Sequence, residues 1–394
     1  MSESTLEIEK IQDTYSLEGI REEWNALLEK SETRTVELSF EWQATYWKYF
    51  NNQNELFVLI VRESGKAVAI VPLKITLAQF LGIKIRRLEI IAAAETNYQD
   101  LIIGENSQCI LNFVFGYLMQ HRRDWDILDL RHIPESSSTV NFFLDPPGVY
   151  PIHKVIQVEK CMFLEIDEGS VDYLSEQRNH NRSRRRLMKQ VRKLERNLGE
   201  PFIKRSTAQQ MEPDLKILFD MHRRRWNRTD TPSMFNDRKY REFYLDASKQ
   251  LIMKGQIELT TLVAGKTPLA QTLNFTYGKD IVGQLLVYDI DYLEYSPEKV
   301  LLDLYISELS SNRTNIFDFG SYNFYKRQWT NRLKNRSDIQ IFPRKFYSDS
   351  LFVLTVLYGA TRNALRKIPV LLSAIKHIRG MIRSLINISR YRAN

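Results

Sequence analysis

Apolar residues form two runs of similar shape, about 200 positions apart along the chain. The run at 56–73 has the pattern of two apolar strands around a short turn, with Gly65-Lys66 at the turn. The run at 257–275 has the same form around Gly265-Lys266. Glycine readily adopts the positive φ that tight hairpin turns often need. We therefore predict a β-hairpin at each place.

The two predicted hairpins stand in similar surroundings. A helical stretch with aromatic residues precedes each one, at 42–50 and at 240–251. A short strand with an Asp between apolar residues follows each one, at 124–130 and at 314–319, after a further helical segment. This recurring order predicts a mixed α/β fold built around a central sheet from two copies of one plan. The alternative is coincidence, since hairpins with glycine turns are common.

The length of 394 residues allows two domains, each with its own core. We expect a first half at 1–155, a second half at 156–346 and a helical tail at 347–394. The segment Asp145-Pro-Pro-Gly148 interrupts regular structure just before the first boundary. The repeated plan ends near Phe346.

Charge is unevenly distributed along the chain. The net charge is +8, but residues 178–205 alone carry +9 and residues 362–394 carry +8, which leaves an acidic remainder of about −9. A protein that coats nucleic acid would be basic over a broad face. This distribution therefore argues against nucleic acid as the main partner.

The remaining composition indicates a cytoplasmic protein. Cys109 and Cys161 offer neither a disulfide framework nor a paired-cysteine metal site, and they fit a reducing compartment. The acidic start of the chain does not have the pattern of a signal peptide. The longest strongly apolar run, 351–358, is too short to span a bilayer.

Familiar catalytic signatures are missing from the sequence. It has no P-loop, HExxH, GxSxG or GxGxxG motif, and its six histidines include no i, i+4 pair. We therefore expect no metal, no serine-hydrolase chemistry and no dinucleotide cofactor.

Two basic clusters lie in predicted helices. The helix at 178–196 combines an apolar stripe at helical spacing with six cations between 184 and 193, among them Arg185. Close cations favour the phosphates of a nucleotide-type cofactor; the alternative is a solvated face over a core stripe. In the second cluster, Arg225 adjoins Trp226 and could stack on it while binding phosphate. The alternative there is a helix surface beside a buried Trp.

The segment 288–299 predicts a strand that ends at Tyr288 and a loop that leads into a new helix. Its last residues fit a helix start: Ser296 is a good N-cap, Pro297 suits the first turn, and Glu298 and Lys299 follow. Free N–H groups and the helix dipole at such a place favour a pyrophosphate. The alternative is an ordinary capped helix.

A second loop leaves the strand that contains Asp318 and passes through Tyr325 and Lys326. Loops at the carboxyl ends of strands often carry function. Lys326 could stabilise the negative charge of a tetrahedral intermediate, or it could be a surface lysine.

The tail has the pattern of a basic amphipathic helix. Leu371, Ile375, Ile378, Ile382 and Leu385 fall at helical spacing, with Lys and Arg on an adjacent face. Such a helix could lie on an anionic membrane surface. The alternative is that it packs back onto the body.

The order of these features resembles the CelD-like branch of the GNAT superfamily (BioF2-like acetyltransferase domain), described as cellulose- or exopolysaccharide-biosynthesis acetyltransferases and related to FemAB. The resemblance covers about residues 20–335. The segments that carry it are 178–196, His222-Arg-Arg-Arg-Trp226, the Gly265-Lys266 hairpin, Tyr295-Ser296-Pro297 and Tyr325-Lys326 with Trp329, and, in the first half, Phe40-Glu-Trp42, the Gly65-Lys66 hairpin and Asn97-Tyr98-Gln-Asp100.

This resemblance implies a tandem GNAT fold and transfer of an acyl group, from acyl-CoA such as acetyl-CoA, to an amine. The donor would bind the second half and the acceptor the cleft between the halves. By this resemblance the pyrophosphate of CoA would lie near Ser296 to Lys299, and the Tyr325-Lys326 pair near the acceptor pocket. Together with the residues singled out from the sequence, the candidate catalytic residues are Lys326, Tyr325 and Asp318. The candidate cofactor-binding residues are Ser296, Pro297, Glu298, Lys299, Tyr288 and Arg185, and the candidate substrate-binding residues are Tyr98, Asp100, Arg225 and Trp226.

Two departures from the family pattern keep other functions open. Tyr322-Asn323 stands where relatives often carry acidic residues, and the Gln/Arg-x-x-Gly-x-Gly/Ala signature for pyrophosphate is absent from the second half. Asp289 and Asp291 are alternative bases to Asp318. The main hypothesis is an N-acyltransferase for a saccharide or other amine acceptor of the cell envelope. The alternatives are an RNA-binding or aminoacyl-tRNA-dependent Fem-like protein, and a non-catalytic accessory protein at the membrane surface.

Overall fold

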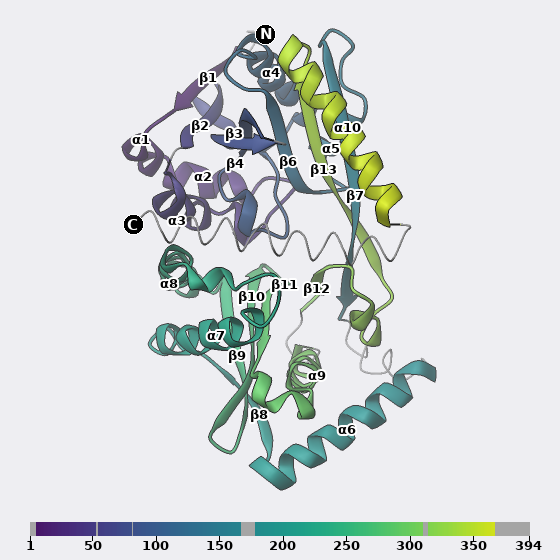
Figure 1. Cartoon of the computed structure of the whole chain (residues 1–394). Helices are drawn as coiled ribbons and strands as arrows, with labels where there is room; N and C mark the ends of the chain where they lie inside the picture. Colours follow the sequence, from purple (N-terminus) through teal and green to yellow (C-terminus); the bar gives the residue numbers. More distant parts are fainter. Residues whose placement is uncertain (1–4, 53, 81, 167–177, 310–313, 367–394) are drawn as a thin grey trace, which may run out of the picture.

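The computed structural model describes residues 5–52, 54–80, 82–166, 178–309 and 314–366, and Figure 1 shows how they are arranged. The first part of the chain forms β1 (Leu6–Ile11), α1 (Thr14–Gly19), α2 (Arg21–Leu28), η1 (Val36–Leu38), α3 (Phe40–Phe50), β2 (Asn54–Glu63), β3 (Lys66–Phe80), β4 (Ile83–Ile90), η2 (Ala93–Glu95), β5 (Ile102–Ile103), α4 (Ser107–Gln120), β6 (Ile127–Pro134), α5 (Ser138–Leu144) and β7 (Ile152–Glu165).

The second part of the chain begins with α6 and then follows a similar order of elements from β8 to β12. It forms α6 (Arg178–Leu198), β8 (Pro201–Arg205), α7 (Met211–Trp226), η3 (Met234–Asn236), α8 (Arg238–Ile252), β9 (Ile257–Ala264), β10 (Thr267–Tyr277), β11 (Asp280–Tyr288), η4 (Ile290–Tyr295), α9 (Pro297–Leu309), β12 (Ile316–Ser321), η5 (Phe324–Gln328), β13 (Leu333–Pro343) and α10 (Phe346–Arg366).

Within the described residues, one mixed sheet carries the strands in the order β1-β2-β3-β4-β6-β13-β7-β12-β11-β10-β9-β8, with β5 paired to β3. Each half contributes an antiparallel meander, β2–β3–β4 or β9–β10–β11. In each half the last meander strand pairs in parallel with the strand that follows a helix: β4 with β6, and β11 with β12. This shared topology confirms the predicted mixed α/β fold and the similar plan of the two halves.

Both predicted hairpins are present. Gly65 joins β2 to β3 with φ +79°, and Gly265 joins β9 to β10 with φ +61°. The turns differ in their packing. A Cβ atom at Gly65 would have nothing within 4 Å, whereas one at Gly265 would collide with the backbone oxygen of Leu198 at the end of α6.

The two halves exchange strands at the centre of the sheet. β13 comes late in the chain but lies between β6 and β7 of the first half. The end of β7, in turn, pairs with β12 of the second half from Cys161 to Glu165. Figure 1 shows β7 and β13 running side by side between the halves. The expected boundary at 155–156 falls inside β7.

The aromatic helices expected at equivalent positions, α3 and α8, pack against each other across the two halves. Each begins at a capping residue: Ser39 accepts a hydrogen bond from the N–H of Trp42, and Asp237 accepts one from that of Lys239. The fully buried Trp42 lies edge-on to the ring of Phe243, with ring centroids 4.6 Å apart, and also contacts Tyr244 and Phe275. The core is therefore shared between the halves.

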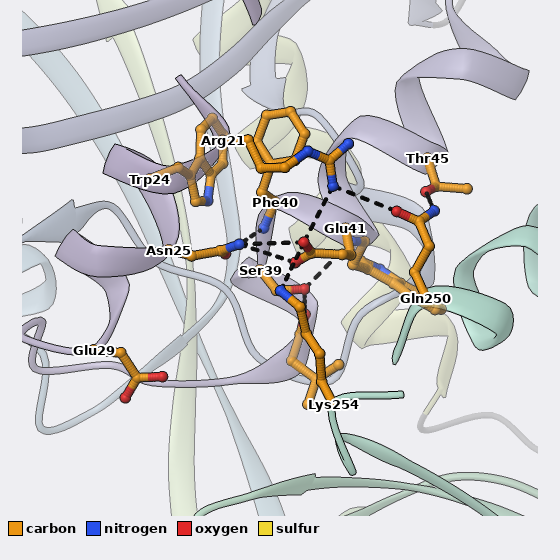
Figure 2. Close-up of polar contacts among 12 residues, drawn as sticks. Arg21, Trp24, Asn25, Glu29, Ser39, Phe40, Glu41, Thr45, Gln250 and Lys254 are labelled. Carbon is orange, nitrogen blue, oxygen red and sulfur yellow. Dashed lines mark hydrogen bonds and ion pairs between the residues drawn. The ribbon is translucent and has the colours of Figure 1, made fainter. Parts of the chain in front are cut away.

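A buried polar network lies beside this aromatic contact, and Figure 2 shows its members. The carboxylate of Glu41 accepts hydrogen bonds from Arg21 Nη1 (3.2 Å) and Asn25 Nδ2 (3.1 Å) of the first half and pairs with Lys254 Nζ (2.7 Å) of the second. Burial opposes its charge, but Lys254 and Asn25 outweigh burial and lower the pKa of Glu41. Gln250 adds a bond to Thr45 Oγ1 (3.0 Å).

The predicted basic helix corresponds to α6, and the stripe residue Leu194 is fully buried in contact with the second half. The tail is described as far as Arg366 in α10, so the predicted amphipathic segment at 371–385 lies outside the described residues. Among the helices that the structure describes, none combines the length and the apolar character needed to cross a membrane.

Candidate functional site

A cavity of about 520 Å³ lies between the two halves. We call it the inter-half cavity. A more polar cavity of about 650 Å³ adjoins it and shares Glu32, Arg34, Tyr277 and Asp280 with it. The inter-half cavity is lined by residues 32–37, 98 and 134–136 from the first half, and by 275, 277, 280–282, 316, 318, 334 and 335 from the second part of the chain.

Asp318 and Tyr98, predicted from opposite halves, meet at this cavity. The Tyr98 hydroxyl donates to Asp318 Oδ2 at 2.7 Å, and Lys334 Nζ pairs with the same oxygen at 2.7 Å. Asp318 Oδ1 accepts from the N–H of Gly320 at 2.6 Å. Three donors thus occupy a carboxylate that is 1% exposed. Burial and the negative charge of Asp318 raise the pKa of Tyr98, so its hydroxyl keeps its proton.

Lys326 lies near Asp318 and is bonded to the end of β12. Its Nζ donates to the carbonyl oxygens of Phe319 (2.6 Å) and Ser321 (2.8 Å). Burial lowers the pKa of Lys326, although the nearby Asp318 works in the opposite direction. A lysine ammonium has three N–H donors, so one remains beyond these two bonds.

Tyr325 turns toward a second group of predicted residues, which we call the Tyr325 cluster: Tyr325, Arg225, Tyr288 and Glu298. The Arg225 guanidinium lies 4.5 Å from the centre of the Tyr288 ring and 5.4 Å from that of Trp226. Burial raises the pKa of Tyr325; Glu298 adds to this effect and Arg225 opposes it. Tyr325 and Lys326 are adjacent in sequence, but Tyr325 belongs to the Tyr325 cluster and Lys326 lies near Asp318.

The start of α9 differs from the predicted phosphate-binding turn. Ser296 has left-handed backbone angles (φ +50°, ψ 53°) instead of the extended angles of a usual N-cap. Its carbonyl oxygen accepts from the N–H groups of Lys299 and Val300 at 3.0 and 3.2 Å. Pro297 has no N–H, and Glu298 places a buried carboxyl at the same helix end. This helix end therefore offers few free donors for a phosphate.

Other predicted residues lie apart from both groups. Asp100 is buried and accepts from Thr33 Oγ1 (2.5 Å), Thr139 Oγ1 (2.7 Å) and the N–H of Leu101 (2.8 Å). Arg185 is exposed on α6, which contacts η4, η5 and α9. The alternative bases Asp289 and Asp291 both pair with Arg224, the latter at 3.0 Å.

Glu37, Lys334 and Asp280 also line the inter-half cavity, and the sequence did not single them out. Glu37 is completely buried, and its Oε1 accepts from the N–H of Asn97 at 3.1 Å. No local pattern marks this residue, because its hydrogen-bond partner Asn97 lies 60 positions away. In the part of the chain that the structure describes, no three His, Cys, Asp or Glu side chains are grouped so as to hold a metal ion.

One family model matches the second part of the chain. Residues 181–348 match the model of the acetyltransferase (GNAT) domain. Among curated protein sequences, none matches the chain.

Several solved structures share the fold of most of the chain. FemX is 10% identical over 88% of this chain and 99% of its own, with a TM-score of 0.58. The C-terminal domain of a putative lysylphosphatidylglycerol synthetase from Agrobacterium fabrum is 11% identical over 86% of this chain and 97% of its own, with a TM-score of 0.53. L-PGS from Bacillus licheniformis is 10% identical over 85% of this chain and 96% of its own, with a TM-score of 0.51. At such identities the likeness is one of fold. Residues 181–348 are therefore similar to the acetyltransferase (GNAT) domain, and most of the chain shares the fold of these solved structures.

Proposed function

We propose that this chain transfers an acyl group from a CoA thioester, such as acetyl-CoA, to a primary amine of a saccharide or other acceptor used in cell-envelope or exopolysaccharide synthesis. The observation that carries the proposal is the inter-half cavity, which meets strand β12 of the GNAT domain at Asp318, next to Lys326. Such a reaction needs a neutral amine held near the thioester carbonyl and a donor for the developing oxyanion.

The residues divide into two roles under this proposal. The donor lies along the Tyr325 cluster, where Arg225, Lys299 and the basic face of α6 meet its phosphates. The acceptor enters the inter-half cavity. The remaining N–H of Lys326, together with the Tyr325 hydroxyl, stabilises the oxyanion. Asp318 positions Tyr98 and Lys334, because three donors already occupy its carboxylate.

A second candidate is an aminoacyl-tRNA donor. It is favoured by the exposed cations of α6, among them Arg185, Arg186, Lys189 and Arg192, and by the few free N–H groups at the start of α9. The fold shared with FemX and with the lysylphosphatidylglycerol synthetases points the same way. A tRNA would bind such a basic helix with strong salt dependence.

Calorimetric titration of the purified protein with acetyl-CoA tests the first candidate. Arg225→Ala removes the guanidinium beside Tyr288, and we expect it to weaken acetyl-CoA binding roughly tenfold, as the loss of one charge-assisted contact would. Arg223→Ala is the matched control: Arg223 lies on the same helix, is exposed and pairs with Asp220 at 3.5 Å. Equal affinities of the two variants would remove Arg225 from the donor site. A wild-type protein that binds tRNA in a salt-dependent way but does not bind acetyl-CoA would replace the first candidate by the second.

We also propose that the protein works in the cytoplasm at an anionic membrane surface. Helix α10 exposes Val353 (52%), Val356 (46%) and Leu357 (56%), which share one helical face, and residues 362–394 add eight Lys or Arg and no acid. Apolar contact combined with cations is what holds interfacial helices on anionic lipid.

Co-sedimentation with vesicles tests this membrane proposal. We expect binding to phosphatidylglycerol vesicles, weaker binding to phosphatidylcholine vesicles, and at least a fivefold loss of binding in a Val353→Asp, Leu357→Asp double variant. Equal sedimentation of the wild-type protein and the double variant would contradict the proposed role of this face.

A further inference from the structure

Glu37 places an unsatisfied carboxyl oxygen at the inter-half cavity. One oxygen accepts from the N–H of Asn97, whereas Oε2 is buried without a hydrogen-bond partner among the described residues. The hydroxyl of Thr35, which lines the same cavity, lies close enough to Glu37 to lower its pKa but makes no hydrogen bond of normal geometry among the described residues. Buried polar groups are nearly always paired, so exceptions that line a cavity point to a ligand.

The cavity carries an excess of negative charge. Arg34 and Lys334 are the cations among its lining residues, and Lys334 is already paired with Asp318. A concave surface of this kind raises the local concentration of cations. Aromatic faces, which also favour ammonium groups, are contributed by Tyr98, Phe275 and Tyr277. The carboxylates that line the cavity are Glu32, Glu37, Glu135, Asp280 and Asp318.

Asn97 connects Glu37 to the place where strands β11 and β12 separate. The parallel pairing of these strands runs from Asp280 with Ile316 to Val282 with Asp318. Just beyond it, Asn97 Nδ2 donates to Gln284 Oε1 of β11 at 2.6 Å, and a Cβ at Gly320 of β12 would lie 3.0 Å from Asn97 Oδ1. Since Asn97 also donates its N–H to Glu37, a group held by Glu37 lies close to the GNAT strands.

The surroundings of Glu37 set its protonation near neutral pH. Burial raises the pKa of Glu37 to about 7; the negative charge of Asp318 adds to this effect, and the N–H of Asn97 and the Thr35 hydroxyl oppose it. Among the other titratable groups at the cavity, Tyr98 retains its proton, Lys334 is paired with Asp318, and burial also raises the pKa of Asp280 and of Tyr277. The remaining charged groups of the lining are Glu32, Arg34 and Glu135. A carboxylate in this range accepts and releases a proton readily.

We propose that Glu37 binds the ammonium group of the acceptor and takes its proton; this inference rests on the proposed acyl transfer to an amine. The carboxylate removes one proton from R–NH₃⁺ and leaves the neutral amine. The amine nitrogen attacks the thioester carbonyl, so a C–N bond forms and the C–S bond breaks. The second nitrogen proton passes to the thiolate, giving amide and free thiol, and Glu37 returns its own proton to solvent.

Ligand-observed NMR on the full chain tests this inference directly. The probes are ethanolamine and glucosamine, each compared with its neutral counterpart, ethylene glycol or glucose. The test variant is Glu37→Gln, which keeps an oxygen for the N–H of Asn97. The control is Glu135→Gln, which alters another carboxylate of the same cavity, one that already accepts from Asn335 Nδ2 at 2.9 Å.

We expect the wild-type protein to bind at least one amine more tightly than its neutral counterpart. Glu37→Gln should lose at least tenfold in amine affinity, and Glu135→Gln less than twofold. Amine binding by the wild-type protein should rise between pH 6 and pH 8, and this rise should be absent from Glu37→Gln. Equal amine affinity of the wild-type and Glu37→Gln proteins, or no preference for amine over neutral probe, would overturn the inference.

Titration of the same variants with acetyl-CoA distinguishes a failure of the proposed thioester donor from a failure of the proposed role of Glu37. Under the inference, Glu37→Gln binds acetyl-CoA as the wild-type protein does, because Glu37 lies outside the Tyr325 cluster. Amine binding that depends on Glu37 in a protein without affinity for acetyl-CoA would overturn the thioester donor and uphold amine recognition. Acetyl-CoA binding without amine recognition would overturn the role of Glu37 alone.

Discussion

The two halves differ most in the segment that follows the last meander strand. In the first half, residues 91–103 pass over β6: the N–H of Gln99 donates to the carbonyl of His132 at 3.2 Å, and the His132 ring contacts the carbonyl of Thr96 at 2.9 Å. In the second half, the corresponding segment forms η4, which contacts α6 and α7. In the first half, this segment therefore lies against the parallel strand β6. In the second half, it lies against the helices α6 and α7 instead.

Because of this difference, two halves with a similar order of elements present different residues at the connecting segment. Connections vary more freely than the strands they join, and they carry most binding residues. The first-half segment brings Asn97 and Tyr98 to β11 and β12 of the other half. The second-half segment leaves Tyr288 and Glu298 beside Arg225 and Tyr325. The first half thus supplies one wall of the inter-half cavity.

The largest expected effect is at the contact between α3 and α8. Trp42→Ala removes a fully buried ring that touches Phe243, Tyr244 and Phe275, so we expect it to lower the free energy of unfolding by about 3–5 kcal/mol. Denaturation in urea measures the change. Trp226→Ala, at a half-buried position, should cost clearly less. A cost below about 1 kcal/mol for Trp42→Ala would show that the halves do not share one core.

The two hairpin glycines sharpen the comparison of the halves. Gly65→Ala forces a residue with a Cβ into positive φ in open space, at a cost of about 1–2 kcal/mol. Gly265→Ala adds a collision with the Leu198 carbonyl, which we expect to raise the total to about 2–4 kcal/mol. Thermal unfolding of the two variants measures the difference. Similar costs would indicate that the end of α6 moves away freely from the second hairpin.

The smallest expected effect on the free energy of unfolding comes from replacing Glu37 or Glu41, and it depends on pH. The pKa of Glu37 rises from 4.5 in the unfolded chain to about 7 on folding, so the folded state binds more protons between these values and wild-type stability falls as pH rises. Glu37→Gln removes this loss and should gain on the order of 1–2 kcal/mol relative to the wild type between pH 5 and pH 7.5.

Glu41 should behave in the opposite sense. The pKa of Glu41 is lowered on folding, so its stabilising contribution is present above pH 4.5 and is lost as pH falls below that value. Glu41→Gln should therefore be destabilising at pH 7 and less so at acidic pH. Urea denaturation at a series of pH values measures both variants. Parallel pH profiles for Glu37→Gln and Glu41→Gln would contradict the difference in their surroundings.

The sequence predicted the features that depend on local pattern. The hairpins at Gly65 and Gly265, the strand with Asp318 and the basic helix α6 follow from spacing and turn chemistry. The aromatic residues of α3 and α8 were correctly seen as equivalents, although nothing local indicates that they pack on one another.

What could not be predicted depends on contacts between distant segments. In the sequence, nothing distinguishes Glu37 from an exposed glutamate. In the structure it is buried, and it accepts a hydrogen bond from Asn97, 60 positions further along the chain. Tyr325 lies near Arg225 and Glu298, whereas Lys326 donates to carbonyls of β12, and local pattern does not specify either set of partners. The position of β13 between β6 and β7 depends on pairing over about 180 positions, and local pattern does not determine it.

The exchange of β13 also has a consequence for synthesis in the cell. A ribosome completes β6 and β7 long before it reaches residues 333–343, so the facing edges of these two strands wait without their partner. Unpaired strand edges on a nascent chain invite association with other chains. A gene that stops before residue 333 would therefore yield aggregating material instead of a stable half. The duplicated protein is synthesised as two halves in sequence but completes its fold as one unit.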